Sequence, residues 1–245
     1  MIPIPGLRDF MRDYFFDFHL HSCLSPCGSE DMTPANIAGM CALAGYDIVA
    51  LTDHNSVGNC AAFCQAAGAY GLLALPGMEL TCAEEVHVVC LFPDLEHALP
   101  FGELVRRRLP SMDNDPRFFG PQLRMDAQDR LLGEETALLA GATDISIHDV
   151  AALVGQYNGL AYPAHIDRDS FSVLSNLGLW DPGMGFSLAE ISRHCPPALL
   201  RRPDLAEVRF ITGCDAHYLD QIPDAAQTMR LPEKTPAAVL RWLFS

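Results

Sequence analysis

Lysine is almost absent from this chain of 245 residues, which contains only Lys234. Lysine and arginine together number 16 against 31 aspartates and glutamates, so the net charge is −15. A surface this negative repels the phosphate backbone of nucleic acids and the headgroups of anionic membranes. The charge therefore argues against a protein that binds long nucleic acid or a membrane surface.

Long apolar runs are also missing. No stretch of about 18 consecutive apolar residues is present, as a spanning helix requires, and residues 1–18 contain no apolar segment of signal-peptide length. The nine cysteines are odd in number and scattered, which fits reduced thiols better than a disulfide framework. We therefore expect a cytoplasmic protein without a membrane span.

The residues that are present describe a folded domain, with 49% hydrophobic and 19% charged residues. Period-two alternation and short apolar runs predict strands at residues 14–21, 47–52, 72–76, 86–92, 159–163, 186–191 and 208–213. Helices are predicted at residues 34–43, 57–70, 96–108, 123–140 and 147–157. Strands separated by helices favour an α/β fold with a mostly parallel sheet, and their number favours a barrel of about seven units. We expect one domain over residues 1–245, with a small helical insertion around residues 94–145.

Histidines and acids gather at the predicted strands. His19 and His21 form an H-x-H pair, and side chains two residues apart on a strand project from one face, so two imidazoles can reach one ion. Asp215 and His217 repeat this spacing. The other candidates at strand ends are His54 beside Asp53, Glu79, His87 and His165.

One such histidine alone is more often structural, but the whole set favours a multinuclear metal site. Imidazoles and carboxylates without thiolate suit Zn, Mn or Fe, and a carboxylate such as Glu79 can bridge two ions. The cysteines are weaker candidates, although Cys27 lies close to His21 in the sequence and stays open as an extra ligand. His97, His148 and His194 are interpreted as structural or solvent-facing.

Five motifs in order resemble the PHP family, named for polymerase and histidinol phosphatase. They are the D-x-H-x-H-S of residues 17–22, the TDHN of 52–55, the PGMEL of 76–80, the AHIDR of 164–168 and the CDAH of 214–217. The resemblance covers most of the chain. It implies a distorted (β/α)7 TIM-like barrel with two or three divalent metal ions and, in stand-alone members, hydrolysis of phosphate esters.

The resemblance also implies a ligand set. One ion would be held by His19, His21, Glu79 and Asp215, a second by Glu79, His87 and His165, and a third by His54 and His217. The family usually gives the third ion another His or Asp about five residues after the H-x-H, where this chain has Pro26. Asp31, Glu30 or Cys27 could replace it, and Asp31 is the first choice.

A metal-activated water attacking phosphorus would make the protein a phosphoesterase. Arg168, three residues after His165, is the best-placed arginine for gripping phosphate, and Arg193 is the next. Asp53 could act beside His54 as an acceptor that orients its ring. With the net charge, this predicts a small phosphorylated metabolite or nucleotide as partner rather than long nucleic acid.

Two other readings stay open. An amidohydrolase-like enzyme acting on C–N or C–O bonds also begins with H-x-H on a barrel strand, but its lysine-bridged form has no candidate here, since Lys234 lies outside every motif. A non-catalytic metal-binding module is the other. The sequence leaves open the substrate, the native metal and the oligomeric state.

Overall fold

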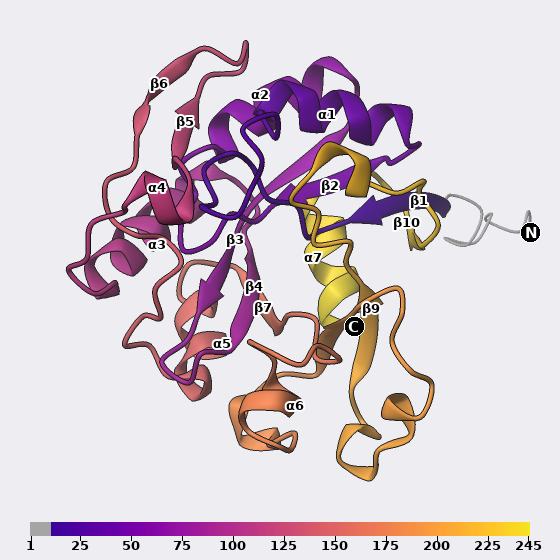
Figure 1. The fold of residues 1–245 in the computed structure, drawn as a ribbon. Coiled ribbons are helices and arrows are strands. Elements are labelled where there is room, and N and C mark those ends of the chain that lie inside the picture. Colours follow the sequence, from indigo (N-terminus) through magenta and orange to yellow (C-terminus); the bar gives the residue numbers. More distant parts are fainter. Residues whose placement is uncertain (1–10) are drawn as a thin grey trace, which may run out of the picture.

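A curled sheet of six strands forms the centre of the computed structural model, which describes residues 11–245 (Figure 1). The strand order is β10-β1-β2-β3-β4-β7. Their bounds are β1 Arg12–Asp17, β2 Ile48–Leu51, β3 Leu73–Thr81, β4 His87–Leu91, β7 Leu160–Pro163 and β10 Thr228–Leu231. The strands β8 Leu188–Ile191 and β9 Arg209–Thr212 form a separate parallel pair, and β8 lies against β7. Together they make the distorted TIM-like barrel that the sequence predicts.

The sheet is less parallel than predicted. The pairs β1–β2 and β2–β3 are parallel, whereas β10–β1, β3–β4 and β4–β7 are antiparallel. For β3 and β4 the reason lies in their short connection, where Glu85 takes a φ of 56° and the amide of Cys82 donates to the carbonyl of Val86. A turn this tight has no room for the crossover helix that a parallel pair needs.

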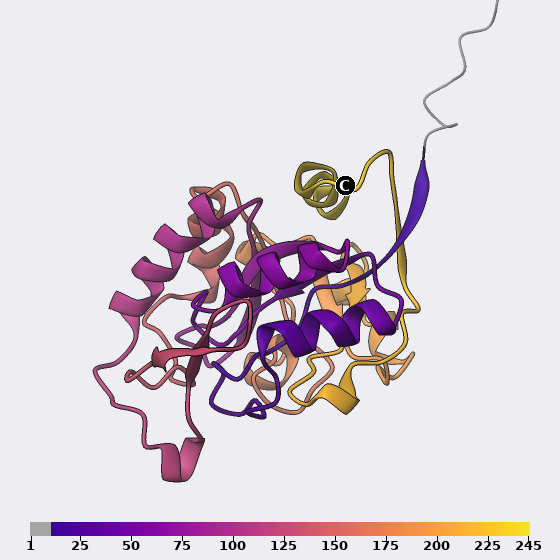
Figure 2. The same cartoon turned by 90° about the horizontal axis from the view of Figure 1, so that it is seen from above.

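Two hydrophobic cores lie on opposite faces of this sheet, because successive side chains of a strand point to opposite sides. Along β2, Val49 and Leu51 belong to one core, and Ile48 and Ala50 to the other. The helices α1 Pro34–Leu43, α2 Cys60–Ala69, α3 Leu95–Arg108 and α5 Ile147–Gly155 cover the first face. The C-terminal helix α7 Pro236–Phe244 covers the second and stands apart from the others when the molecule is seen from above (Figure 2).

Three of the four helices that cover the first face begin at a capping side chain. Thr33 caps α1 with its hydroxyl, and Pro34 occupies the first turn. Asp94 caps α3 and Ser146 caps α5 in the same way. The remaining short helices are α4 Pro116–Phe119 and α6 Val173–Asn176. Single 3-10 turns occur at Pro182–Met184, Leu199–Arg201, Pro203–Leu205 and Leu219–Gln221.

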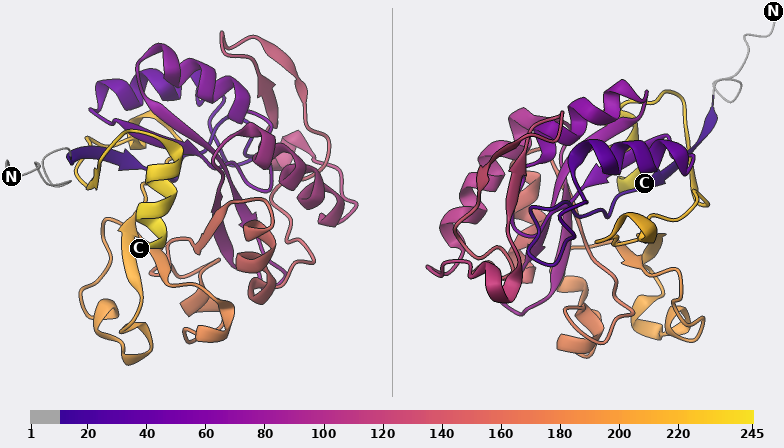
Figure 3. Two further views of the ribbon diagram at one scale, coloured as in Figure 1. Left: turned by 180° about the vertical axis from the view of Figure 1, so that it is seen from behind. Right: turned by 45° about the horizontal axis from the view of Figure 1, so that its top comes forward.

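The helix predicted over residues 123–140 is wrong. This segment is a hairpin of β5 Leu123–Met125 and β6 Leu131–Glu134, and it lies beside α3 and α4 (Figure 3). The Asp126 carboxylate accepts the amides of Gln128 and Arg130 and closes the turn. Asp129 at the tip then accepts the hydroxyl of Thr33 and docks the hairpin on the start of α1. Aspartate side chains that bond to nearby amides favour turns over helices.

Residues 1–10 lie outside the described residues. The predicted domain begins with them, and the expectation that residues 1–18 contain no signal peptide falls partly on them. Within residues 11–245 every helix is too short or too polar to span a bilayer. The nine cysteines all lie in this part of the chain, and none of them forms a disulfide there, as the sequence predicts.

Candidate metal centre

Seven of the eight ligand candidates that the motifs supply gather at one end of the sheet, at the ends of different strands. His19 and His21 follow β1, and His54 follows β2. His87 is the first residue of β4, which runs opposite to β3, so its amino end lies at the same edge. His165 follows β7, and Asp215 and His217 follow β9. The remaining candidate, Glu79, lies within β3.

Glu79 is the centre of this cluster. It points to the same face as Leu75, because the two lie four residues apart on β3, and its side chain is buried. One oxygen, Oε1, lies 3.0 Å from Nδ1 of His87 and 3.1 Å from Nε2 of both His19 and His165. The other, Oε2, lies 3.0 Å from Nδ1 of His54 and 3.4 Å from Nε2 of His21. A single carboxylate thus faces five imidazoles.

Asp215 provides a second carboxylate beside the H-x-H pair. Its Oδ1 lies 3.1 Å from Nε2 of His21 and 3.3 Å from Nε2 of His19. Its Oδ2 lies 2.6 Å from Nη1 of Arg168. The Nδ1 of His217 bonds to the main-chain oxygen of Asp215 at 3.0 Å, which leaves Nε2 of that ring as the available ligand atom.

Three groups of side chains in the described residues have ligand atoms within 4.8 Å of one another, the spacing that a shared ion requires. They are His19, His21, Glu79 and Asp215; His54, Glu79 and His87; and His21, His54 and His217. His165 stands outside these groups but contacts Glu79. Glu79, His21 and His54 each take part in two groups.

Several atoms of the cluster are buried without a hydrogen-bond partner, and this tests whether a metal fits. They are Nδ1 of His54, His87 and His165, Oε2 of Glu79 and Oδ1 of Asp215. Leaving a buried polar atom without a hydrogen bond costs about 1–3 kcal/mol. Five such atoms in one cluster therefore need an explanation. Divalent cations supply it, because neutral imidazoles and carboxylates are the donor types that Zn, Mn and Fe accept.

The charges in the cluster influence one another strongly. Burial favours neutral Glu79, but the imidazoles of His87, His19 and His54 outweigh it and hold the pKa of Glu79 well below its usual value. Burial together with the imidazoles of His217 and His54 lowers the pKa of His21 far below the usual value. Ionised carboxylate and neutral imidazole are the forms that bind metal.

His19 behaves differently. Burial opposes its charge, but the carboxylates of Glu190, Asp215 and Glu79 outweigh this and raise the pKa of His19 well above the usual value. The cluster therefore attracts positive charge.

Two of the ligand candidates have strained backbones. His165 has a φ of 28° and Asp215 a φ of 50°, values that residues with a side chain rarely adopt. Such strain costs about 1–3 kcal/mol and is concentrated at functional sites. Both residues follow the last residue of a strand closely, so the strain turns their side chains into the cluster.

Three predicted site residues lie elsewhere. Asp53 does not contact the ring of His54; its carboxylate accepts the amide and hydroxyl of Ser22 and the hydroxyl of Ser25, all at 2.6–2.7 Å. Asp31 is exposed and joins none of the ligand groups. Arg193 donates to the main-chain oxygen of Asp224 and to the hydroxyl of Tyr46, away from the cluster.

Sequence reasoning missed two residues that hold the rings in place. Glu190 on β8 is buried, and its Oε1 lies 2.8 Å from Nδ1 of His19. Ser25 places its hydroxyl 3.0 Å from Nδ1 of His21 and donates to Asp53, so Asp53 acts on His21 through Ser25. Ring partners of this kind fix the orientation of metal-binding imidazoles. The only sequence signal for Glu190 is a single acid inside an apolar strand.

A hollow of about 200 Å³ opens over the cluster. Glu79, His87, His165 and Asp215 line its base, and Arg168 and Phe171 line its mouth. The Phe171 ring stacks on His87, with centroids 4.7 Å apart. The side chain of Arg168 is 46% exposed, so it can reach both Asp215 and a ligand in the hollow.

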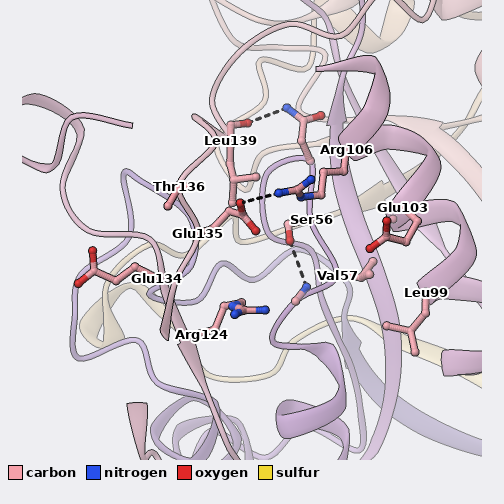
Figure 4. Close-up of a pocket in the computed structure, with 13 residues that line it drawn as sticks. Ser56, Val57, Leu99, Glu103, Arg106, Arg124, Glu134, Glu135, Thr136 and Leu139 are labelled. Carbon is pink, nitrogen blue, oxygen red and sulfur yellow. Dashed lines mark hydrogen bonds and ion pairs between the residues drawn. The ribbon is translucent and has the colours of Figure 1, made fainter. Parts of the chain in front are cut away.

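A second hollow of about 510 Å³ lies between α3, the segment after His54 and the β5–β6 hairpin (Figure 4). Arg106 pairs with Glu135 across it at 3.6 Å. Its walls carry two arginines and three glutamates, and it shares no lining residue with the hollow over the cluster. It therefore has neither the ligands nor the charge of the metal centre.

Comparisons with known proteins show which solved structures have a similar fold. No known family profile and no curated protein matches the sequence. Among solved structures, the lesion-specific endonuclease EndoQ of Pyrococcus furiosus matches 93% of this chain with a TM-score of 0.67 and 15% identity, and this chain spans 55% of its length.

Two further structures match along almost their whole length. A protein of Bifidobacterium adolescentis, assigned as a metal-dependent phosphoesterase, has a TM-score of 0.61 and 19% identity, with 94% and 95% of the two chains covered. An amidohydrolase of Chromobacterium violaceum has a TM-score of 0.57 and 20% identity, with the same coverage.

One of these comparisons corrects an expectation. Endonuclease Q has been solved with a 27-mer duplex that carries an abasic lesion at the active site, and this chain matches that structure with a TM-score of 0.67. The exclusion of long nucleic acid, drawn from the net charge, is therefore wrong, because total charge does not describe the charge at the mouth of one site. The fold expectation is confirmed: the chain has a distorted TIM-like barrel that is similar to the folds of this endonuclease and of the protein assigned as a metal-dependent phosphoesterase.

Proposed function

We propose that this protein is a phosphoesterase that hydrolyses a phosphate monoester of a small metabolite or nucleotide at a centre of two or three divalent metal ions. The observation that carries the proposal is the buried carboxylate of Glu79, which faces five imidazoles across two ligand groups. This is the arrangement expected of a carboxylate that bridges metal ions. Zn, Mn and Fe are the ions that suit these donors.

The assignment of ligands follows the contacts. His19, His21, Glu79 and Asp215 form the first group, and Glu79 with His54, His87 and the adjacent His165 forms the second. His54 and His217 serve the third. Bound divalent ions supply a hydroxide nucleophile at neutral pH and neutralise the phosphate oxygens.

The chain itself positions the ester. Arg168 stands at the mouth of the hollow, where its guanidinium can donate two parallel hydrogen bonds to phosphate oxygens. Phe171, whose ring stacks on His87, lines the same hollow. A hollow of about 200 Å³ holds a phosphoryl group and a small part of its alcohol.

The first test is phosphate release from nucleotides, 3′,5′-bisphosphates and histidinol phosphate with Mn or Zn added, and after chelation. Metal-dependent release supports the proposal. The same protein is incubated with a DNA duplex containing an abasic site, since a neighbour acts on such DNA. Cleavage of the duplex without release from any monoester would replace the monoester with a diester substrate.

An amidohydrolase activity is the second candidate, favoured by the matching amidohydrolase fold. A lysine-bridged centre is unsupported in the described residues, because Nζ of Lys234 donates to the main-chain oxygen of Gly71, and neither residue belongs to a ligand group. Amides and lactones in the same panel separate this activity from a phosphoesterase. Silence on every substrate from protein that retains its ions would favour a non-catalytic metal-binding module. A cytoplasmic location is proposed as well, supported by nine unpaired thiols.

A further inference from the structure

Phe171 is an exposed apolar residue at the mouth of the hollow over the cluster. Its ring stacks on the ring of His87, with an angle of 19° between the two planes. A stacked neighbour covers one face of a ring, and Phe171 is nevertheless 42% exposed. The other face of the ring and its edge are therefore open to a molecule in the hollow.

The backbone of Phe171 is strained. Its φ is 52°, in a region that a bulky residue rarely adopts. Neighbours on both sides hold this conformation: the carbonyl of Phe171 accepts the amide of His87 at 2.9 Å, and the next residue, Ser172, is fully buried. Strain that the surrounding structure maintains is concentrated at sites that contact ligands. Burial in a core does not explain it here, because the ring is only partly covered.

The position of Phe171 relative to Arg168 is fixed by one turn. The amide of Arg168 donates to the carbonyl of His165 at 2.9 Å, and the hydroxyl of Ser172 donates to the carbonyl of Arg168 at 2.7 Å. A hollow of about 200 Å³ holds a phosphoryl group and only a small part of its alcohol. The rest of the alcohol must extend to the mouth, where the open ring of Phe171 lies.

We propose that Phe171 is a specificity-determining residue, whose open face stacks on a planar ring in the alcohol part of the substrate. This inference rests on the proposed phosphoesterase and narrows its substrates to esters that carry an aromatic ring. A nucleobase and an imidazole share the chemistry that this face recognises, a flat π-system that can stack on phenylalanine. One stack of this kind is worth about tenfold or more in binding.

The test compares substrates with and without the ring, using the whole metal-loaded protein. Adenosine 5′-monophosphate and ribose 5-phosphate differ by the nucleobase, and histidinol phosphate and phosphoethanolamine differ mainly by the imidazole. In at least one pair, we expect kcat/KM of the wild type to be at least about tenfold higher for the member with the ring. The pair that shows this preference identifies the source of the ring.

Variants of Phe171 separate stacking from other contacts. Phe171→Leu keeps an apolar side chain beside His87 but has no planar ring. This variant and Phe171→Ala should bring the ratio within the pair close to one, mainly by lowering kcat/KM for the member with the ring. Phe171→Tyr keeps the ring and should keep the preference. Phe118→Ala is the matched control, because Phe118 is 80% exposed on α4 and does not line the hollow.

The outcomes distinguish this inference from the proposed function. Phosphate release with a ratio near one in both pairs, or with an unchanged ratio in Phe171→Leu and Phe171→Ala, overturns the inference and leaves the phosphoesterase standing. An equal loss for both members in Phe171→Ala also overturns it, because Phe171 would then only support His87.

Calorimetry decides the inference if no monoester is hydrolysed and the proposed function fails. Tighter binding of a member with the ring by the metal-loaded wild type, lost in Phe171→Leu, would support stacking without turnover. Equal binding of both members in both pairs would overturn it.

Discussion

Glu79 is the residue whose removal tests the metal centre most directly, because its two oxygens face five imidazoles. Glu79→Gln keeps the shape of the side chain and removes its charge. We expect the variant to lose at least one bound ion and several kcal/mol of transition-state stabilisation, about a thousandfold in kcat/KM. Elemental analysis and phosphate release measure the two effects.

His97→Ala is the control for that experiment. The ring of His97 bonds to Asp94 at the start of α3 and lies outside the ligand groups, so metal content and turnover should stay at the wild-type level. A fully loaded and active Glu79→Gln variant would contradict a bridging role for this carboxylate.

Glu190 acts through His19 and is a positioning residue. Glu190→Gln weakens the bond that orients the His19 ring, and we expect metal affinity to fall by about 10–100-fold, as for other partners of metal-binding imidazoles. Gly213→Ala should act in the same direction, since a methyl group there would lie 2.3 Å from the Glu190 carboxyl and displace it. Zn²⁺ titration measures both variants. Unchanged affinity in both, with folding retained, would leave Glu190 a core residue only.

Replacing Arg168 tests the proposed contact with phosphate. Its guanidinium pairs with Asp215 and is half exposed, so its loss removes a phosphate contact without removing a ligand. Arg168→Ala should raise KM for a phosphorylated substrate by about tenfold to a hundredfold, the worth of a charged hydrogen bond of about 1.5–3 kcal/mol. Metal content should be unchanged. A variant with normal KM and lowered metal content would show that Arg168 supports Asp215 instead.

At the scale of elements, the cap of α5 provides a prediction about stability. Glu84 accepts the hydroxyl of Ser146 at 2.6 Å and the amide of Ile147 at 2.9 Å. Partial burial opposes the charge, but these two hydrogen bonds outweigh it and lower the pKa of Glu84. Glu84→Gln should reduce the free energy of unfolding at pH 7 by about 0.5–1 kcal/mol, a typical cap contribution in a solvent-screened position.

The pH dependence has a defined sign. Because the folded pKa is below the unfolded value of 4.5, the extra stability of the wild type is present above that pH and is lost as the pH falls through the folded pKa. In urea titrations, the difference in the free energy of unfolding between wild type and Glu84→Gln should therefore be smaller at pH 3 than at pH 7. An equal difference at both would assign the effect to packing.

The helices and strands also show which parts of the fold can be predicted from the sequence. Local patterns predict the capped helices and the strands that precede each motif, because cap residues and period-two alternation act within one element. They miss the hairpin of residues 123–134, since its turn is fixed by Asp126 and by the docking of Asp129 on Thr33, almost a hundred positions earlier. Sequence spacing likewise favoured Asp31 as a ligand, because spacing alone cannot show that this side chain is exposed and joins none of the ligand groups.

At the scale of the whole molecule, the net charge does not predict the charge at the entrance of the site. Five of the acids in residues 11–245 are buried, namely Asp17, Asp53, Glu79, Glu190 and Asp215. Two of them face the proposed ions, and the entrance carries the arginine Arg168. The field that an anionic substrate meets is thus set by this local arrangement.

The buried cluster links metal binding to the stability of the whole fold. Its donors come from β1, β2, β3, β4, β7 and β9, so one ion group cross-links strands that are distant in sequence. An ion that binds only the folded chain stabilises it by about 4 kcal/mol at a concentration a thousand times its dissociation constant. For a chain of this size, that corresponds to a rise in Tm of roughly 10 °C.

Chelation should therefore lower the Tm of the wild type by that amount, and added Zn²⁺ or Mn²⁺ should restore it; calorimetry measures both. Glu79→Gln should respond much less, because it has lost the carboxylate that joins two groups, whereas His97→Ala should respond like the wild type. An equal Tm with and without ions, at saturating metal, would mean that the ions bind the folded and unfolded chain equally, which a cluster assembled from six strands does not allow.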